Sequence, residues 1–390
     1  MSWKQIASLA RRLRLVKLAL KGQQSMSQLC RLFGVSRRTG YKWRGRFERE
    51  GTRGLRDRSH RPHRSPGELG SRWLSRVRRW RWRHRSWGSR KLRAALAREY
   101  PRQAVPSART IDYWLRQLPW TGRGPRRTRL GPPLRRRALT ISGQSNQVWT
   151  VDFKGWFRTR DGQRVEPLTV RDLFSRYLLA VRVLPDQSWR PVRRVFMRLF
   201  GQYGYPSIIR VDNGSPFGSS GPAGLSRLSA WWTALGIGVE FIAPGHPEQN
   251  GAHEQMHRVL KAETTRPPSN HPQAQQRRID RWVKTYNEVR PHEALGQSPP
   301  AAVYRRRPGL VREVALSYPK GWAIRQVRSN GQIKWQGRKR FIGEAFVGYP
   351  VGLRRWRAEK WRVYFAGRLI GELWQSDGGG MRPAKYMRRS

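Results

Sequence analysis

The sequence VWTVDF at residues 148–153 places Asp152 inside an apolar run with the length and composition of a β-strand. The sequence IIRVDNG at residues 208–214 ends a second short apolar run on Asp212. A buried ionised carboxylate is costly unless a positive partner compensates it. The chain has only 24 Asp and Glu beside 81 Lys and Arg. Two carboxylates at strand positions therefore predict a specific site that requires negative charge.

A third acid, Glu254, lies early in a helix predicted to follow Gly251, in NGAHEQMHRVLK at residues 250–261. Mg²⁺ prefers oxygen ligands and keeps several waters, so a few carboxylates and a substrate phosphate complete its shell. Two such ions ~3.5–4 Å apart can activate an attacking oxygen and stabilise a leaving one in a phosphoryl displacement. We predict that Asp152, Asp212 and Glu254 hold two Mg²⁺ or Mn²⁺ ions and are the catalytic residues.

Each acid also has an ordinary structural interpretation. Asp212 precedes Asn213 and Gly214, which are typical of a turn that ends a strand. Asp152 could lie at a sheet edge or act as a cap, and the helix dipole favours Glu254 near a helix start. These alternatives stay open for each acid taken alone, while the joint arrangement favours a metal site.

The residues around the three acids form a larger pattern: WTVDFK at 149–154, DLFSRY at 172–177, DNGS at 212–215, and PEQNGAHE at 247–254 with His257 and Lys261. The pattern continues with YN at 286–287, RPHEALG at 290–296 and PPA at 299–301. Together, and with the amino-terminal segments, these motifs resemble insertion-sequence transposases of the retroviral integrase superfamily. The resemblance implies a ribonuclease H-like α/β core with a mixed five-stranded sheet, and it implies the Asp152, Asp212 and Glu254 triad.

Glu248 competes with Glu254 for the third catalytic position. The resemblance favours Glu254, because the family places its catalytic glutamate three residues after the glycine of an Asn-Gly pair, which here is Gly251. The separation from Asp212 is longer than in the shortest members of the superfamily. We attribute the excess to an insertion in the glycine- and serine-rich residues 218–224.

The formal net charge of +57 makes nucleic acid the natural partner, because such a charge repels itself unless a polyanion neutralises it. An anionic membrane surface is the alternative, but the sequence has no long apolar run and no signal-peptide pattern. We expect a soluble protein of the bacterial cytoplasm, associated with the nucleoid. The single cysteine, Cys30, excludes an internal disulfide and a multi-cysteine zinc site.

The amino-terminal sequence predicts a helix-turn-helix, with helices at 4–21, 27–33 and 37–48 and a tight turn at Gly34. The third helix of such a motif enters the DNA major groove. We therefore predict DNA contacts from Arg37, Arg38, Lys42 and Arg44. A plain three-helix bundle with a solvated basic face is the alternative.

A second bundle follows, with one helix around Trp73 to Trp80, one capped by Ser89 and one capped by Ser107. WGSRKL at 87–92 and PSARTI at 106–111 resemble the second helix-turn-helix of the same transposases, which makes Arg109 a predicted DNA contact. The basic linker before this bundle could follow a phosphate backbone or be a disordered tether.

In the core, residues 147–157 and 163–170 predict two strands joined at Asp161-Gly162, and 177–184 predicts a third strand of an antiparallel meander. Helices are expected at 191–203 and 225–235, and strands at 207–212 and 239–242. Beyond residue 308, short strand-like runs at 323–327, 332–335, 346–347, 361–365 and 369–373 resemble the small SH3-like barrel of integrases.

The expected amino-terminal parts are a helix-turn-helix domain at 1–50, a basic linker at 51–66, a second helix-turn-helix domain at 67–120 and another basic linker at 121–143. The catalytic core is expected at 144–307, a small β-barrel DNA-binding domain at 308–376 and a basic tail at 377–390.

Glu254, Arg258 and Lys261 fall on one face of their helix, so a metal ligand and two cations would line one groove. We predict DNA contacts from Asn250, His257, Arg258 and Lys261, with His257 alternatively orienting a ligand. Solvated charges and a hydrogen-bonded core histidine are the structural alternatives.

These features predict a DNA transposase that binds terminal inverted repeats, nicks double-stranded DNA with two metal ions, and joins the freed 3′-hydroxyl to target DNA. Because an element has two ends, a homodimer or larger oligomer is expected. A catalytically silent DNA-binding regulator derived from a transposase is the main alternative, and a plain nuclease is another.

Overall fold

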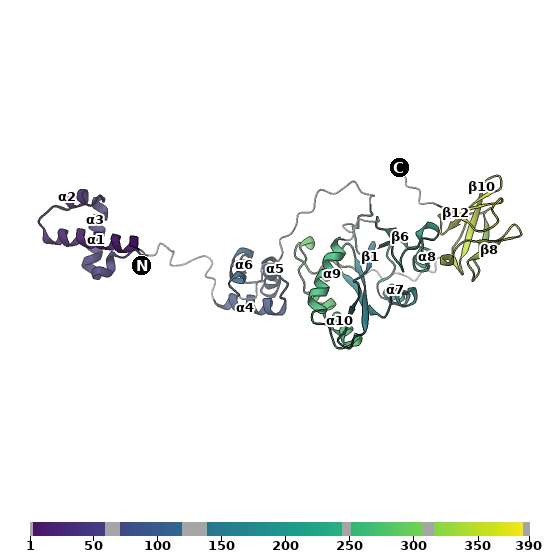
Figure 1. Cartoon of the computed structure of the whole chain (residues 1–390), viewed down its shortest axis with the longest axis horizontal. Coiled ribbons are helices and arrows are strands. Elements are labelled where there is room, and N and C mark those ends of the chain that lie inside the picture. Colours follow the sequence, from purple (N-terminus) through teal and green to yellow (C-terminus); the bar gives the residue numbers. More distant parts are fainter. Residues whose placement is uncertain (1–2, 59–70, 119–138, 244–250, 307–315, 385–390) are drawn as a thin grey trace. The chain divides into compact units, whose positions relative to one another are not determined.

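The structure of the chain is a computed structural model (Figure 1). It describes residues 3–58, 71–118, 139–243, 251–306 and 316–384. It divides into two compact units, residues 1–69 and 70–390. None of the described helices is both long and apolar enough to cross a lipid bilayer.

The first unit is a helix-turn-helix, as predicted. Its helices are α1 (Trp3–Lys21), α2 (Met26–Leu32), α3 (Arg37–Glu50) and the 3₁₀ turn η1 (Gly51–Leu55). The Ser36 hydroxyl accepts the backbone N–H of Thr39 at 3.2 Å and so caps α3. Gly34 has φ +63, which permits the tight turn before α3. Leu15, Val16 and Trp43 form the centre of a small apolar core.

Three further helices begin the second unit: α4 (Ser71–Arg83), α5 (Ser89–Glu99) and α6 (Ala108–Arg116). Ser107 caps α6 by accepting the backbone N–H of Thr110 at 3.1 Å, as predicted. The predicted cap at Ser89 is wrong, because Gly88 occupies the N-cap position and Ser89 is already helical. Buried Trp87, Leu92 and Ile111 hold the three helices together.

A mixed sheet forms the centre of the core. Its strands are β1 (Val148–Phe153), β2 (Phe157–Arg158), β3 (Arg164–Asp172), β4 (Leu178–Leu184), β5 (Ile208–Val211) and β6 (Gly238–Phe241). β1, β3 and β4 form the predicted antiparallel meander, and β5 and β6 run parallel to β1. The sheet has six strands where five were predicted, because the two-residue β2 pairs with β3.

Helices cover both faces of this sheet, as Figure 1 shows. They are α7 (Trp189–Tyr203), α8 (Arg227–Ala234), α9 (Gly251–Thr264) and α10 (Pro272–Glu288), with short turns η2 (Pro222–Gly224), η4 (Glu293–Leu295) and α11 (Pro300–Val303). Trp149 and Val151 of β1 pack with α7 and α8. Because side chains alternate along a strand, Thr150 and Asp152 face the opposite side, where α9 lies.

The carboxy-terminal segment is all-β, with β7 (Ala323–Gln326), β8 (Gln332–Trp335), β9 (Arg338–Phe341), β10 (Pro350–Arg357), β11 (Lys360–Phe365), β12 (Arg368–Trp374) and β13 (Arg382–Pro383). The expected barrel is not closed, because β8 and β9 form a two-stranded sheet separate from the five-stranded sheet β13-β12-β11-β10-β7. The strand predicted at 346–347 is also wrong, since the 3₁₀ turn η5 (Glu344–Phe346) lies there.

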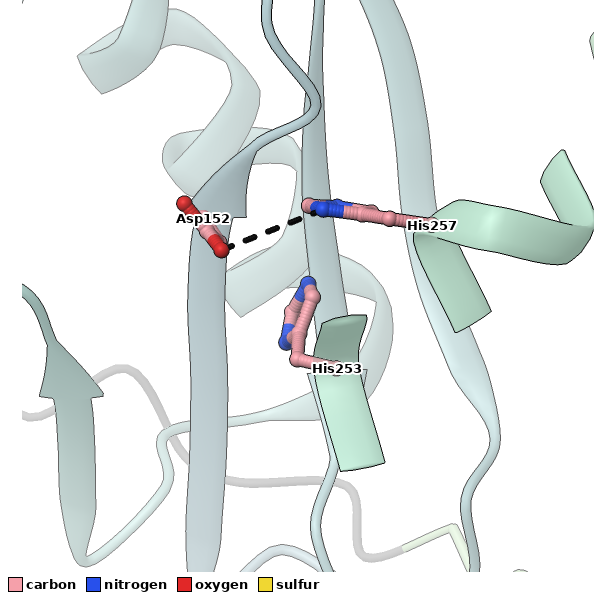
Figure 2. A group of neighbouring side chains, drawn as sticks. All are labelled: Asp152, His253 and His257. Carbon is pink, nitrogen blue, oxygen red and sulfur yellow. Dashed lines mark ion pairs between the residues drawn. The ribbon is translucent and has the colours of Figure 1, made fainter. Parts of the chain in front are cut away.

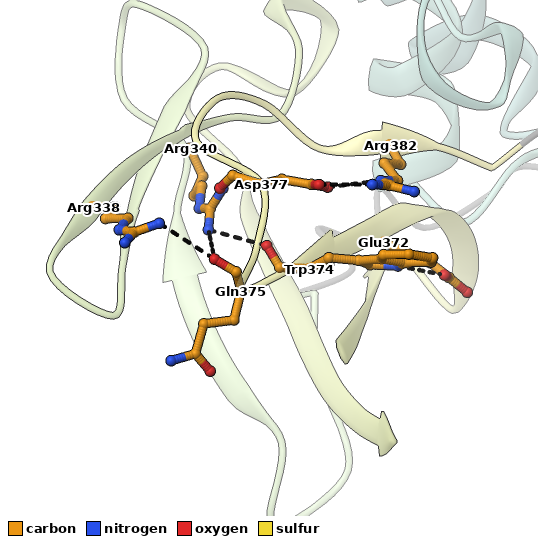
Figure 3. Close-up of polar contacts among 7 residues, drawn as sticks. All are labelled: Arg338, Arg340, Glu372, Trp374, Gln375, Asp377 and Arg382. Carbon is orange, nitrogen blue, oxygen red and sulfur yellow. Dashed lines mark hydrogen bonds and ion pairs between the residues drawn. The ribbon is translucent and has the colours of Figure 1, made fainter. Parts of the chain in front are cut away.

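Arg340 fastens the β8–β9 hairpin to the end of β12 (Figure 3). Its side chain is 2% exposed and donates to the backbone carbonyls of Trp374, at 3.1 Å, and Asp377. The Asp377 carboxylate in turn accepts two hydrogen bonds from Arg382, each 2.7 Å. The hairpin is also linked by Arg338, which donates to the Gln375 carbonyl, and by the Met381 N–H, which donates to the Phe341 carbonyl at 2.8 Å.

Replacing each of the two glycines of α3 by alanine should change the stability of the fragment of residues 1–69 in opposite directions. A Cβ on Gly40 would lie 2.5 Å from Cys30 Sγ and 3.0 Å from Met26 Sδ, whereas one on Gly45 would meet nothing within 4 Å. We expect Gly40→Ala to lower the free energy of unfolding by about 1–3 kcal/mol through overpacking. Gly45→Ala should raise it by about 1 kcal/mol through helix propensity.

Urea unfolding followed by circular dichroism measures both changes. Combining Gly40→Ala with Cys30→Ala should recover part of the loss, because the nearest clashing atom is removed. Equal stabilisation by both alanines would show that α2 and α3 do not approach as closely as described.

Candidate active site

The parallel pairing of β1 and β5 brings two of the three predicted acids together. Thr150 of β1 is registered with Arg210 of β5, so the same register two residues further on places Asp152 beside Asp212. Neighbouring strands lie about 4.8 Å apart, and paired residues point to the same face. Adjacent carboxylates at the carboxyl ends of two parallel strands follow directly from this register.

The third acid reaches the same place from α9. Glu254 lies in the first turn of that helix and is exposed. The negative charges of Asp212 and Glu254 both act on the Asp152 carboxyl. The fold thus brings Asp212 and Glu254 close enough for their charges to act on Asp152, although all three are far apart in the sequence.

The pKa of Asp152 reflects this crowding. Burial is the main cause, and together with the charge of Asp212 and the weaker effect of Glu254 it raises the pKa to about 7, while the Phe153 backbone N–H and Lys154 act in the opposite direction. Burial also raises the pKa of the Asp212 carboxyl. A half-buried group of carboxylates that repel one another favours binding of a cation.

Two histidines of α9 lie close to Asp152, with His257 facing its carboxylate (Figure 2). The Thr169 hydroxyl donates to the Asp152 backbone carbonyl at 2.9 Å. Its oxygen also lies 2.6 Å from His253 Nε2 and 2.8 Å from His257 Nε2. Since the single hydroxyl proton goes to the carbonyl, both imidazoles must donate to Thr169 through Nε2–H.

The same assignment leaves both Nδ1 atoms as acceptors. Because His253 is neutral, its Nδ1 accepts from the Thr150 hydroxyl at 3.0 Å in preference to the longer 3.4 Å contact of that hydroxyl with the Arg171 carbonyl. His257 Nδ1 lies 3.9 Å from Asp152 Oδ2. Burial, followed by Lys154 and Arg171, lowers the pKa of His257 to about 3, so the ring is neutral. The Nδ1 lone pair of His257 and the Oδ2 atom of Asp152 therefore face the same small space, as the ligands of a metal ion do.

The donor set fits a divalent metal ion. Ligand atoms of Asp152, His253 and His257 lie within 4.8 Å of one another, and His253 already uses both ring nitrogens on threonines. Asp152, Asp212 and Glu254 supply oxygen, which Mg²⁺ and Mn²⁺ prefer. His257 is the histidine whose Nδ1 lone pair faces the same space, and imidazole suits Zn²⁺ or Fe²⁺ better than it suits Mg²⁺ or Mn²⁺.

Two lysines lie beside the carboxylates. Burial lowers the pKa of Lys154, and the charge of Lys261 lowers it further, so the two ammonium groups are close together. Arg258 and Lys261 are both exposed on the α9 face that carries Glu254. The three acids are thus flanked by the cations Lys154, Arg258 and Lys261, which could bind the phosphates of a nucleic-acid backbone.

The other predicted DNA contacts occupy varied positions. Arg37, Arg38 and Lys42 are exposed on α3, and Arg44 pairs with Glu48 at 2.8 Å. Arg109 is exposed in the first turn of α6. His257 is 8% exposed, a placement that favours orienting a ligand over touching DNA. Asn250 and Glu248 lie outside the described residues.

Sequence reasoning missed His253, Thr169 and Thr150. The spacing of His253 and His257, four residues apart on one helix face, was a usable signal because α9 was already predicted. The threonines offered none, since their role depends on the register that sets Asp152 beside Thr169 across β1 and β3.

The chain matches two integrase core domain families, one at residues 143–247 and one at 235–300. It also matches a helix-turn-helix domain family at 11–63 and a homeodomain-like domain family at 39–115. These matches cover the segments that carry the three acids and the amino-terminal helices.

Named relatives come from bacterial insertion elements. The chain is 32% identical to the IS407 uncharacterized 31.7 kDa protein of Burkholderia multivorans, over 45% of this chain and 61% of that protein. It is 34% identical to the IS136 uncharacterized protein of Agrobacterium fabrum, over 42% of this chain and 85% of that protein. It therefore spans about six-tenths of the length of the first relative and most of the second.

A solved structure, the HTLV-2 integrase catalytic core domain in complex with magnesium, is 14% identical, covers 42% of this chain and 100% of that domain, and has a TM-score of 0.31. The family matches and the insertion-element relatives define the class as integrase-core proteins. The chain belongs to the DDE insertion-sequence transposases of the retroviral integrase superfamily.

The raised pKa of Asp152 predicts how stability changes with pH when divalent metal is removed. Its folded pKa, about 7, exceeds the ordinary 3.8, so its stabilising contribution is complete below pH ~4 and is lost as the pH rises through 7. At pH 8, Asp152→Asn should therefore be more stable than wild type, by about 2–4 kcal/mol. The difference should vanish near pH 4.

Thermal unfolding across this pH range, with and without EDTA, measures the effect. Asp280→Asn, which changes an exposed aspartate on α10, should show no such gain. Mn²⁺ should stabilise wild type and leave Asp152→Asn nearly unchanged. A stabilisation by Asp152→Asn that is the same at pH 4 and pH 8 would contradict the crowding of the three acids.

Proposed function

We propose that the protein binds the terminal inverted repeats of its element and catalyses metal-dependent nicking and strand transfer at Asp152, Asp212 and Glu254. The observation that supports this proposal is the placement of Asp152 on β1, Asp212 directly after β5 and Glu254 on α9, where the charges of Asp212 and Glu254 act on the buried Asp152 carboxyl. In a chain of net charge +57, a local concentration of negative charge next to lysines matches a site that holds cations against DNA.

In the proposed reaction, a water oxygen attacks the phosphorus at the element end, the bond from phosphorus to O3′ breaks, and a 3′-hydroxyl is freed. That hydroxyl then attacks a target phosphodiester, whose own P–O bond breaks, so no covalent protein intermediate and no energy source are needed. Two divalent ions bound by the acids supply activation of the attacking oxygen and stabilisation of the leaving one.

The side chains around the acids have distinct roles in this proposal. Asp152, Asp212 and Glu254 hold the cations, and Lys154 and Lys261 bind non-bridging phosphate oxygens. His257 turns its Nδ1 lone pair toward Asp152 Oδ2, 3.9 Å away, so that both atoms could bind one cation, while Thr169 holds the ring through Nε2. Neutral imidazoles are important here, because an imidazolium would compete with a metal for Asp152.

The remaining domains position the DNA. We propose that residues 1–50 and 67–120 bind the repeats through Arg37, Arg38, Lys42, Arg44 and Arg109. The all-β segment at 308–376, whose strands do not close into a barrel, adds contacts to the DNA backbone. Two ends must be joined together, so a homodimer or larger assembly on DNA is proposed as the active form.

Strand transfer by the purified protein tests the proposal. The substrate is a duplex carrying the DNA that flanks the gene, incubated with Mg²⁺ or Mn²⁺ and target plasmid. Glu254→Gln should reduce both nicking and joining by at least about 100-fold, since even changes to groups behind a metal ligand cost 10–100-fold. Binding of the duplex should be unchanged.

Glu288→Gln is the matched control, because Glu288 is exposed at the end of α10, and it should retain full activity. If both proteins bind the ends and neither cuts nor joins, the chain is a DNA-binding regulator. Cleavage without joining would identify a nuclease, and an active Glu254→Gln would direct attention to Glu248.

A further inference from the structure

A second polar site lies beside the candidate active site. It is a cavity of about 430 Å³ along the Ala252, Gln255 and Val259 side of α9. Four cations line it: Lys91 of α5, Arg171 at the end of β3, Arg176 in the β3–β4 turn, and Arg290 after α10. The integrase-core reaction as proposed uses none of these four side chains.

Arg171 shows that the cavity is built for a charged occupant. Its side chain is 2% exposed, and Nη1 donates to the Ala252 carbonyl at 2.7 Å. Its Nε, also buried, has no hydrogen-bond partner among the described residues. Burial lowers the pKa of Arg171 to about 10, so the guanidinium stays charged at neutral pH. The guanidinium also hydrogen-bonds the Tyr286 side chain, but its buried Nε donor has no partner in the described part of the chain, and an unpaired buried donor is costly.

His292 shows that the four cations converge. Burial and then the charges of Lys91, Arg290, Arg171 and Arg176 lower its pKa to about 3, so its ring is neutral. Its Nε2 is also buried without a partner among the described residues. All four cations therefore act on one ring, which can add a neutral hydrogen bond to theirs.

The nearby acids neutralise this charge only in part. Glu263 pairs with Arg290 at 3.0 Å, and Glu293 pairs with Arg90 at 2.8 Å in an exposed position. Arg171 and Arg176 make no ion pair within the described ranges. Arg176 is also held at φ +64, a conformation rare for a residue with a side chain. Such retained strain is typical of functional positions.

We propose that this cavity binds a phosphate group. Arginine forks suit phosphate oxygens, and lysine adds a point charge. The cavity also joins two parts of the second unit, because Arg98 of α5 donates to the Val289 carbonyl at 2.8 Å and Lys91 comes from the same helix. A bound phosphate would hold the helices α4–α6 against the core.

The position of the cavity relates it to the three acids. Thr169, which holds the active-site histidines, and Arg171 lie two residues apart on one face of β3, about 7 Å from each other. A DNA strand that presents one phosphate to Asp152 can therefore present another to the cavity. The proposal that the cavity binds phosphate depends only on the residues of the cavity. The further proposal that this phosphate belongs to DNA rests on the proposed function.

Inorganic phosphate is the first probe, titrated into the full-length protein by calorimetry against chloride at equal ionic strength, without DNA or divalent metal. We expect Lys91→Gln and Arg176→Asn each to weaken phosphate binding about tenfold, the loss of one charge-assisted contact. Asn is chosen because it tolerates positive φ. Arg182→Gln removes a half-exposed cation of β4 outside the cavity and should bind as wild type.

A second arm identifies the source of the phosphate. Duplex binding is measured over a series of salt concentrations without divalent metal, so that no strand is cut. If the occupant is a DNA phosphate, Lys91→Gln and Arg176→Asn should each lower the slope of log affinity against log salt by about 0.9 relative to Arg182→Gln. Equal slopes with phosphate binding intact would identify free phosphate.

Both arms are independent of strand transfer, so a failure of catalysis leaves them interpretable. Unfolding midpoints measured without phosphate verify that the variants are folded. If phosphate binds wild type, both cavity variants and Arg182→Gln with the same affinity, or binds wild type no better than chloride does, the proposal is overturned.

Discussion

Burial of the Asp152 carboxylate beside two other acids is the interaction on which the core depends. The parallel register of β1 and β5, extended two residues beyond Thr150 and Arg210, sets Asp152 beside Asp212, and α9 adds Glu254 from a distant segment. Burial first, and then the charges of Asp212 and Glu254, raise the Asp152 pKa to about 7. A protein that keeps such a destabilising arrangement gains from what the arrangement binds, as strained or charged sites commonly do.

The rest of the core can be understood as support for that arrangement. Trp149 and Val151 anchor β1 in the apolar layer under α7 and α8, which turns Asp152 toward α9. Thr169 then fixes the Asp152 backbone and both histidines through one hydroxyl. Because Thr169 and the two imidazoles are neutral, they do not neutralise the carboxylate, and its charge remains available to a cation.

Much of this arrangement could be predicted from the sequence, because it depends on local patterns. Apolar periodicity located α3, α7 and β5 to within a few residues, and Ser36 and Ser107 marked helix starts through capping. Contacts between distant segments were harder to predict from the sequence. The Thr169 bridge depends on the β1–β3 register, and the cavity around Arg171 forms only when α5, β3 and the end of α10 come together. β10 was missed because LRRWR at 353–357 has charged residues where a strand pattern expects apolar ones.

Anomalous diffraction at the manganese edge, from crystals of the protein grown with Mn²⁺, would locate the bound ions. Manganese peaks are expected within coordination distance of the Asp152 and Asp212 carboxylates, with Glu254 adjoining, and they should be lost in Asp152→Asn. Manganese bound by Asp152 with His253 and His257, and away from Asp212 and Glu254, would contradict the three-carboxylate site.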